Sequence, residues 1–177
     1  MADNYLEYHR EDYERRKAQW LAKQKRSHAP KKRINNPATS KTSAVALTNT
    51  INMKNQIATT NAPAAIGPYS QAVEANGTIY ISGQLPIDPA TGNFVEGGIK
   101  ELTRQSLTNI KNILEAAGTD MKHAVKMGVF LADMADFAEM NEVYAEFFEA
   151  PFPARSAVAV KTLPKNARVE IECIAVK

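Results

Sequence analysis

An arginine lies inside a segment whose other residues are typical of a β-strand. Residues 151–160 read PFPARSAVAV, in which two prolines precede a run of small and β-branched residues. The guanidinium of Arg155 keeps its charge at every physiological pH. One interpretation is a surface position, or an ion pair with an acid on a neighbouring strand. The other is an anchor for an anionic ligand, because the planar guanidinium matches a carboxylate through two parallel hydrogen bonds.

The remaining residues give no sign of metal or disulfide chemistry. Cys173 is the only cysteine, and His9, His28 and His123 lack the spacing of metal ligands. We therefore expect no metal site and no intramolecular disulfide, as in proteins of a reducing compartment. No segment approaches the roughly 20 apolar residues of a membrane span, and the N-terminal MADNYLEYHREDYERR is too polar for a signal peptide. These features predict a cytoplasmic protein without a membrane anchor.

The charge is unevenly distributed along the chain of 177 residues, whose net charge is +3. Residues 1–33 hold ten Lys/Arg and five Asp/Glu, whereas residues 34–177 hold twelve and fourteen. Aromatic residues are interleaved with the N-terminal basic residues, so this segment either binds nucleic acid or an acidic partner, or forms a solvated helical tail.

The composition also predicts the domain organisation. Residues 4–26 contain no Gly or Pro and carry acid–base pairs at helical spacing. Residues 27–52 are rich in Ser, Thr, Asn, Lys and Pro, as linkers are. We therefore predict a basic, partly helical extension with its linker over residues 1–52, and one folded domain over residues 53–177.

The folded domain begins with strand and helix patterns that are easy to separate. YSQAVEA and TIYISGQ flank Asn76-Gly77, which predicts two antiparallel strands joined by a tight turn. A helix is predicted from Gly98 to Ala117, with Gly118 at its C-terminal cap. Its apolar residues recur at helical spacing; they are Ile99, Leu102, Leu107, Ile110, Ile113 and Leu114.

The second half of the domain repeats the pattern. HAVKMGVFLAD predicts a strand, and residues 136–149 predict a helix that begins at an Asp136 N-cap and is ended by Pro151 and Pro153. The inward residues of this helix are expected to be Phe137, Met140, Tyr144 and Phe147. ARSAVAV and ARVEIECIAV predict two final strands.

This order of elements predicts an α+β fold with both helices on one face of the sheet. The other face then carries alternating Ile, Val and Ala side chains that no helix covers. Burial against further subunits in a closed ring would cover them.

Four separated motifs resemble one known family. They are NAPAAIGPYSQAV, ISGQLPIDPATG, FPARSAVAV and VEIECIAV, in this order from about Met53 to the C-terminus. Together they resemble the Rid family, also called YjgF-like, and most closely its RidA branch of imine deaminases. The resemblance implies a chorismate-mutase-like mixed β-sheet with two helices on one face, and a homotrimer with active sites between subunits.

The resemblance also implies an activity. RidA-type proteins are 2-iminobutanoate/2-iminopropanoate deaminases, which hydrolyse the reactive imines released by pyridoxal-phosphate-dependent dehydratases to 2-keto acids and ammonia. They need no cofactor of their own, since the pyridoxal phosphate belongs to the dehydratases. By the same resemblance Arg155 holds the substrate carboxylate, and Glu170 positions or activates the attacking water.

Five further residues match substrate-binding positions of the family. Tyr69 lines the pocket, Ser82 and Gly83 form a loop beside it, and Asn141 lies near it on the second helix. Ala157 stands where many RidA proteins have a cysteine, so a thiol nucleophile at this position is excluded, whereas a backbone N–H to the carboxylate is retained.

Two alternatives stay open at this point. A non-catalytic Rid-type module that binds a small carboxylate would need Arg155 but not Glu170. An RNA-acting protein resembling an endoribonuclease would use the basic residues between 10 and 33, although the near-neutral remainder of the chain argues against nucleic-acid binding.

Overall fold

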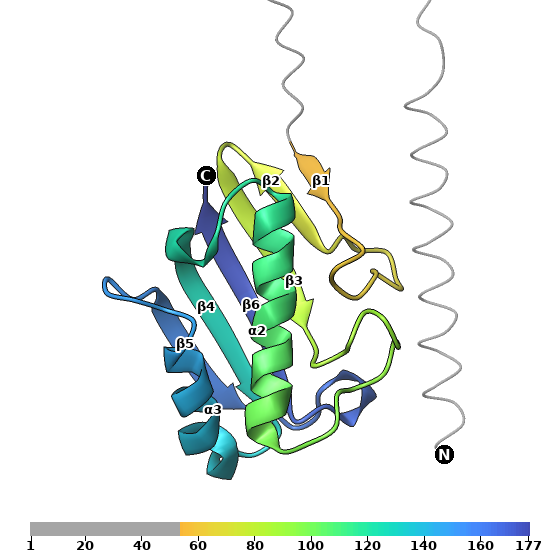
Figure 1. Cartoon of the computed structure of the whole chain (residues 1–177), viewed down its shortest axis with the longest axis vertical. Helices are drawn as coiled ribbons and strands as arrows, with labels where there is room; N and C mark the ends of the chain where they lie inside the picture. The colour runs from red at the N-terminus through yellow and green to blue at the C-terminus, as the bar shows by residue number, and fades with distance from the viewer. Residues whose placement is uncertain (1–53) are drawn as a thin grey trace, which may run out of the picture. The chain divides into compact units, whose positions relative to one another are not determined.

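The structure, a computed structural model, describes residues 54–177 (Figure 1). The helical extension and linker predicted over residues 1–52 lie outside the described residues. The strands are β1 (Asn55–Ile57), β2 (Ala72–Ala75), β3 (Thr78–Gln84), β4 (Ala124–Leu131), β5 (Ala154–Ala159) and β6 (Val169–Val176). The helices are α2 (Ile99–Ala116) and α3 (Phe137–Ala145), with short 3-10 turns η1 (Met121–His123), η2 (Met134–Asp136) and η3 (Pro164–Asn166).

One mixed sheet carries all six strands in the order β1-β2-β3-β6-β4-β5. Both helices lie on the same face of it, as the sequence predicts (Figure 1). β6 pairs antiparallel with both β3 and β4, whereas β5 runs parallel to β4. A parallel neighbour needs a crossover connection, which α3 provides. β1, three residues long at the opposite edge, was not predicted.

The β2–β3 hairpin forms where Asn76-Gly77 predicts it. Both turn residues have positive φ angles, 53° and 75°, which Asn and Gly tolerate better than other residues. The turn sets the register, with Ala75 opposite Thr78.

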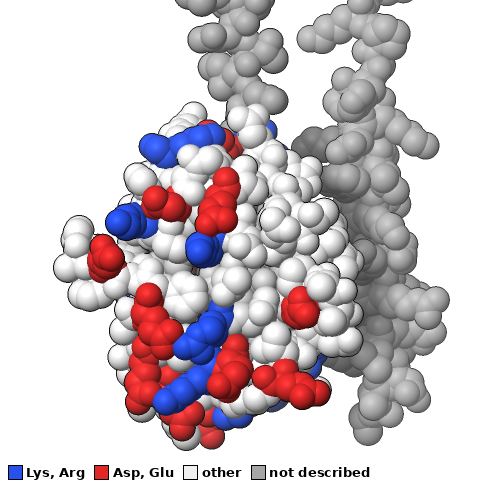
Figure 2. Space-filling view, viewed as in Figure 1, with Lys and Arg blue, Asp and Glu red and all other residues white. Residues whose placement is uncertain are grey.

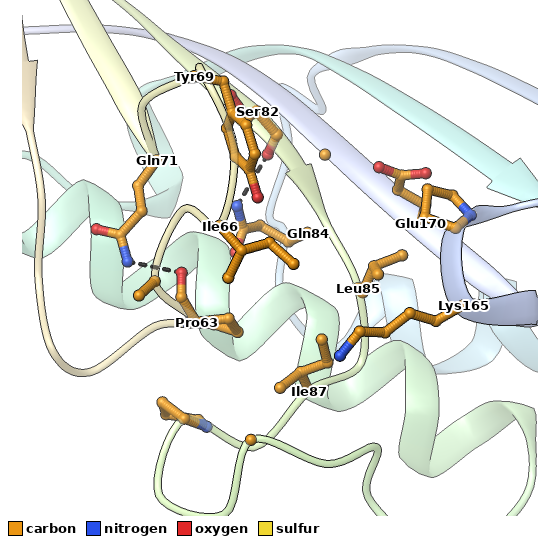
Figure 3. A pocket seen from close by; sticks show the side chains of 15 residues that line it. Pro63, Ile66, Tyr69, Gln71, Ser82, Gln84, Leu85, Ile87, Lys165 and Glu170 are labelled. Carbon is orange, nitrogen blue, oxygen red and sulfur yellow. Dashed lines mark hydrogen bonds between the residues drawn. The ribbon is translucent and has the colours of Figure 1, made fainter.

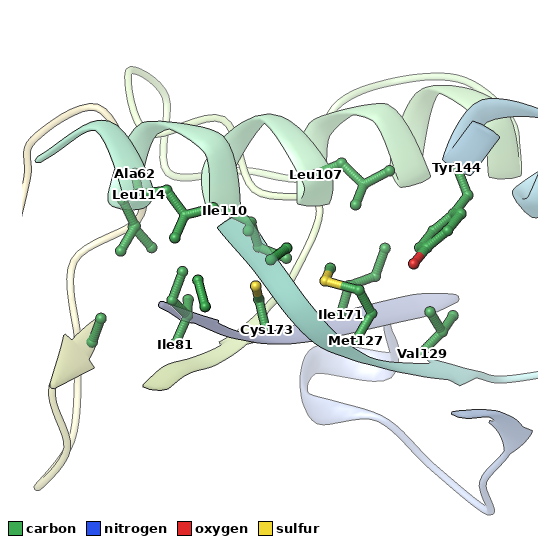
Figure 4. Packing of buried hydrophobic residues seen from close by; sticks show 14 of the residues in the cluster. Ala62, Ile81, Leu107, Ile110, Leu114, Met127, Val129, Tyr144, Ile171 and Cys173 are labelled. Atoms are coloured by element: carbon green, nitrogen blue, oxygen red, sulfur yellow. The ribbon is translucent and has the colours of Figure 1, made fainter. Parts of the chain in front are cut away.

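The core lies between the sheet and α2 (Figure 4). All six apolar residues predicted to face inward on this helix are buried. The helix begins at Gly98, whose N–H donates to the Glu101 carboxylate at 2.8 Å, and Gly118 follows its end with a φ of +79°. Facing side chains on the sheet include Met127, Ile171 and Cys173, all fully buried.

The second helix is shorter than predicted. α3 begins at Phe137 but ends at Ala145, six residues before Pro151, so the prolines do not end it. Of the predicted inward residues, Met140 and Tyr144 are buried. Phe147 is only partly buried and Phe148 takes the buried position, because the chain leaves the helical path between them.

Asp136 has the predicted N-cap position of this helix, but its side chain does not cap the helix. Asp136 occupies the N-cap position but makes no capping hydrogen bond. Its carboxylate instead accepts two hydrogen bonds from the guanidinium of Arg168. The sequence pattern of an N-cap is therefore present without its usual function.

The sheet face opposite the helices is mixed in character rather than uniformly apolar. Along β6, Val169, Ile171 and Cys173 are buried under the helices, so the alternate residues point to the open face. The open-face residues of the three strands β3, β4 and β6 include Tyr80, Lys126, Phe130, Glu170, Glu172 and Ile174. The open face thus presents apolar surface together with two carboxylates.

Candidate active site

A cavity of about 650 Å³ lies beside the C-terminal end of β3 (Figure 3). The loop before β2, the segment after β3 and the η3 turn form its walls. Four of the predicted site residues line it, namely Tyr69, Ser82, Gly83 and Glu170. Apolar wall residues that the sequence did not single out are Pro63, Ile66, Leu85 and Ile87.

The wall nearest the hairpin is held by the buried amide of Gln71. Its Oε1 accepts from the backbone N–H of Thr59 at 2.7 Å, and its Nε2 donates to the carbonyls of Thr59, Ala62 and Pro63 at 2.9, 3.1 and 2.8 Å. One side chain therefore satisfies four backbone groups of a loop that has no strand partner there. Gln71 lies in the NAPAAIGPYSQAV motif, but nothing in the sequence indicates this role.

The polar groups of the cavity are oriented by the backbone. The Ser82 hydroxyl donates to the Ser70 carbonyl at 2.8 Å. Since a hydroxyl has one hydrogen, Ser82 can only accept a hydrogen bond from a ligand. The Tyr69 ring lies against Gly67, remains 50% exposed, and gives the entrance an apolar surface beside Ile66.

The side chain of Glu170 extends from β6 to the backbone of Gly83 on β3. A Cβ added to Gly83 would lie 2.0 Å from Oε1 of Glu170, so only glycine leaves the space that the carboxylate occupies. The strand register shifts between Ile81 and Gln84, as at a β-bulge, and bulges are frequent beside active sites. The carboxylate is thereby placed against backbone at the cavity wall.

Burial, and to a lesser extent the nearby Glu172 carboxylate, raise the pKa of Glu170 above its usual value. Glu172 lies two residues away on the same face. A carboxyl group with a raised pKa is a better proton acceptor when ionised, which suits general acid–base catalysis.

Lys165 is the second charged residue of the cavity. It lies in the η3 turn with a φ of 56°, and the next residue, Asn166, has a φ of 55°. Its ammonium group extends toward Ile87 (Figure 3). Within residues 54–177 neither Lys165 nor Glu170 forms an ion pair. The prediction from sequence did not include Lys165, because a Leu-Pro-Lys-Asn turn looks like a plain connection.

Arg155 lies elsewhere, on β5. It is level with the buried Met127 of β4, and its guanidinium lies over two rings of α3, so it points to the helix-bearing face. The guanidinium carbon is 4.4 Å from the ring centroid of Tyr144 and 5.6 Å from that of Phe137. Among the described residues no acid pairs with it. The first interpretation, an ion pair with a neighbouring strand, therefore has no counterpart in this part of the chain.

Asn141 and Ala157 lie on the Arg155 side. Asn141 is four residues after Phe137 and three before Tyr144, so all three share one face of α3. Ala157 is two residues after Arg155 and therefore faces the same way, partly buried against the core. Three predicted site residues thus form a second group, the Arg155 group, while the cavity holds the other four.

The two groups are separated within one chain. β4 lies between β5 and β6, so Arg155 and Glu170 lie on strands about 10 Å apart. Their side chains also point to opposite faces of the sheet. A small ligand therefore cannot contact both groups of the same chain.

The remaining features concern the cysteine, possible metal ligands and possible membrane-spanning helices. Burial raises the pKa of the Cys173 thiol to about 12, as expected for a small buried residue outside the site. In residues 54–177 no cluster of His, Cys, Asp and Glu could hold a metal ion, and no helix there is long and apolar enough to cross a membrane.

The charge of the described residues is close to balanced. Residues 54–177 contain eleven Lys/Arg and fourteen Asp/Glu, a net charge of −3. On the helix-bearing face acidic and basic side chains are interleaved (Figure 2). Two ion pairs, Lys100–Glu142 and Arg104–Glu146, join α2 to α3 there. This face carries no basic stripe of the kind that follows a nucleic-acid backbone.

Comparisons with known proteins agree with the motifs. The sequence profile of the family described as endoribonuclease L-PSP matches residues 59–177. A RutC family protein from Pyrococcus horikoshii is 58% identical over 125 residues, covering 71% of this chain and 99% of that protein. The 2-iminobutanoate/2-iminopropanoate deaminase of Bos taurus is 58% identical over 121 residues, covering 68% and 88%.

A solved structure shows the same fold. The crystal structure of YyfA, from the conserved Rid protein family of Yersinia pestis, superposes with a TM-score of 0.68 at 50% identity. The match covers 70% of this chain and 99% of that one.

Proposed function

This chain belongs to the endoribonuclease L-PSP family, and from that premise we propose that it is a 2-iminobutanoate/2-iminopropanoate deaminase. The resemblance of its motifs to the Rid family is confirmed by the relatives it matches. The observation that carries the proposal is a pair of charged groups that have no ionic partner within residues 54–177. Glu170 lies partly buried against Gly83 in a cavity wall, and Arg155 lies partly buried over aromatic rings. A substrate with one carboxylate and one C=N carbon suits such a pair.

The proposed reaction gives each group one role, Arg155 as the anchor and Glu170 as the proton carrier. Arg155 binds the substrate carboxylate through two N–H groups and so fixes the position of the imine carbon. Glu170 accepts a proton from water as the water oxygen adds to that carbon. The protonated Glu170 then returns this proton to the nitrogen, which gives a carbinolamine with one hydroxyl and one amino group. In the second step Glu170 takes the hydroxyl proton and passes it to the nitrogen as the C–N bond breaks, so that ammonia and a 2-keto acid leave. The sum is imine plus water giving ketone plus ammonia, and no oxidant or reductant is needed.

A complete site then requires two copies of the chain. Because Arg155 and Glu170 point to opposite faces, we assign them in each site to neighbouring subunits of a homotrimer. The exposed apolar side chains of the open face, such as Tyr80 and Val158, support this arrangement, because contact between subunits would cover them. Sedimentation of a monomer at working concentration would contradict it.

The cytoplasmic location expected from the sequence is part of the same proposal, because a protein that hydrolyses dehydratase by-products must be present in the compartment where they form. Cell fractionation followed by immunoblotting tests it. Recovery of the protein in a membrane or organelle fraction would contradict it.

A coupled assay tests the activity. Threonine and a threonine dehydratase generate 2-iminobutanoate, and semicarbazide traps the imine that survives. The wild-type protein is expected to reduce trapping, whereas Arg155→Ala and Glu170→Gln are expected to lose about 1,000-fold in kcat/KM. Unchanged trapping with the folded wild-type protein would contradict the deaminase and favour a module that only binds carboxylates.

The description of the matched family also names an endoribonuclease. The net charge of −3 over residues 54–177 argues against an RNA surface there. Titration of the full chain and of a chain lacking residues 1–52 with a single-stranded RNA, at two salt concentrations, separates the two functions. Tight, salt-dependent binding that disappears with residues 1–52 would favour the RNA alternative.

A further inference from the structure

The guanidinium of Arg155 has an aromatic support that the proposed reaction does not explain. Its carbon atom lies 4.4 Å from the centroid of the Tyr144 ring, well within the range of about 6 Å for a cation–π contact. The Phe137 ring, 5.6 Å away, comes from the same helix two turns earlier. Tyr144 is therefore the nearer of the two rings.

We propose that Tyr144 is the positioning residue for Arg155, and that its ring sets the plane in which the guanidinium meets the substrate carboxylate. This inference rests on the proposed function, because it takes Arg155 as the carboxylate anchor. It concerns a residue that does not touch the substrate and acts through another side chain.

A ring suits this purpose better than an acid. An aspartate or glutamate would hold the guanidinium by its N–H edge, the same edge that must bind the substrate, and would compete with it. An aromatic ring contacts the flat face of the guanidinium and leaves the N–H edge free. Among the described residues no acid contacts Arg155, so the aromatic contacts are what restrains its long side chain.

The ring is itself held firmly. Tyr144 is only 6% exposed, and its centroid lies 4.5 Å from that of Phe148, the neighbouring ring of the core. A side chain buried to this degree in a close-packed core has little freedom to turn, whether its neighbour is a ring or an aliphatic side chain. The guanidinium thus lies over a rigid surface.

The Tyr144 hydroxyl has no part in this contact. It is buried and finds no hydrogen-bond partner among the described residues. Burial also raises the pKa of Tyr144 to about 12, so the phenol stays neutral and is no acid–base catalyst at neutral pH. A phenylalanine at this position should therefore position Arg155 as well as the tyrosine does.

Three variants separate the ring from the hydroxyl and from general stability. Tyr144→Phe keeps the ring, and Tyr144→Leu keeps apolar volume without a π face. Phe148→Leu removes a neighbouring ring that is not one of the two under the guanidinium. We expect Tyr144→Leu to raise KM and weaken the binding of 2-oxobutanoate about 5- to 20-fold, with a smaller change in kcat. Tyr144→Phe should keep wild-type values, and Phe148→Leu should lower Tm while changing KM less than about twofold.

The outcomes are decisive in both directions. A wild-type KM for Tyr144→Leu, an equal loss for Tyr144→Phe, or an equal rise in KM for Phe148→Leu would overturn the proposal. Should Tyr144→Leu fail to fold, Tyr144→Met provides the same contrast. Calorimetric titration with 2-oxobutanoate measures binding of a carboxylate without relying on the deaminase activity. If the wild type binds this carboxylate without hydrolysing imines, the proposed function fails while the Tyr144 comparison stands, and no binding at all overturns the positioning proposal.

Discussion

The cavity beside β3 and the Arg155 group on β5 hold their charged side chains by different means. Around the cavity, backbone geometry and hydrogen bonds decide the positions, because Gln71 fixes one wall and Gly83 leaves space for the Glu170 carboxylate. In the Arg155 group the guanidinium forms no hydrogen bond within residues 54–177, and contacts with the rings of Tyr144 and Phe137 hold it instead.

This difference follows from what each charge must do. In the proposed reaction the carboxylate that moves protons needs a fixed position and partial removal from water, and the removal from water raises its affinity for a proton. A guanidinium that binds an anion needs its N–H groups unoccupied until the anion arrives. Because the two arrangements lie on opposite faces of one sheet, the proposed function takes each chain to provide halves of two different sites.

The strongest test of this division is complementation between two inactive chains. Arg155→Ala retains a complete cavity, and Glu170→Gln retains a complete Arg155 group. If one site takes its halves from neighbouring subunits, co-expressed chains in equal amounts should restore about one quarter of the wild-type sites, since each half is intact with a chance of about one half. Two affinity tags allow the mixed oligomers to be isolated and their imine hydrolysis measured. In these isolated mixed trimers, which exclude both homotrimers, about one site in three should be complete.

Separately purified variants, mixed without exchange of subunits, form the control and should stay inactive. Mixed oligomers with no more activity than either variant would show that Arg155 and Glu170 act within one chain, and would require a large rearrangement of the sheet.

The sequence was sufficient for the elements that local rules determine. The Asn76-Gly77 turn and the periodicity of α2 predicted the hairpin and the long helix with the correct inward residues. The end of α3 was misplaced because apolar residues continue through Phe148 after the helix has ended. β1 was missed because three residues are too few to show alternation.

The sequence named candidate site residues but could not give their arrangement. Which side of the sheet Arg155 faces depends on its parallel pairing with β4, a contact between segments distant in sequence. Lys165 and Gln71 were missed for a similar reason. Lys165 reaches the cavity only because its turn has a left-handed backbone conformation. Gln71 satisfies backbone groups eight to twelve residues away.

A smaller effect is expected from filling the space over Gly83. In Gly83→Ala the new methyl group would overlap the Glu170 carboxylate, which must then leave the cavity wall. We expect kcat to fall about 10- to 100-fold with little change in KM, because the Arg155 group is untouched. Steady-state kinetics with the coupled assay measure both parameters.

Gly128→Ala is the matched control. Its methyl group would lie 2.6 Å from the Glu172 carboxylate, an equivalent clash on the same face of the sheet. Glu172 does not line the cavity, so kcat should stay within about twofold of the wild-type value. Equal losses for both alanine variants would mean that the clash disturbs the sheet and that the position of Glu170 is not the cause.

The smallest expected effect is the pH dependence of stability that Glu170 confers. Burial first, and the Glu172 carboxylate second, raise the pKa of Glu170 in the folded protein. The folded state therefore binds the proton more tightly than the unfolded state does, and the resulting stabilisation is present below the unfolded pKa and lost as the pH rises through the folded pKa. Since glutamine does not ionise, Glu170→Gln should match the wild-type Tm near pH 4 and exceed it by a few degrees near pH 7. Thermal unfolding followed by circular dichroism at both pH values measures this difference.

Glu96→Gln, at an exposed position, should show no such gain. A Glu170→Gln protein that is less stable than the wild type at pH 7 would mean that a favourable partner, such as a group of the neighbouring subunit, stabilises the ionised carboxylate more than burial destabilises it.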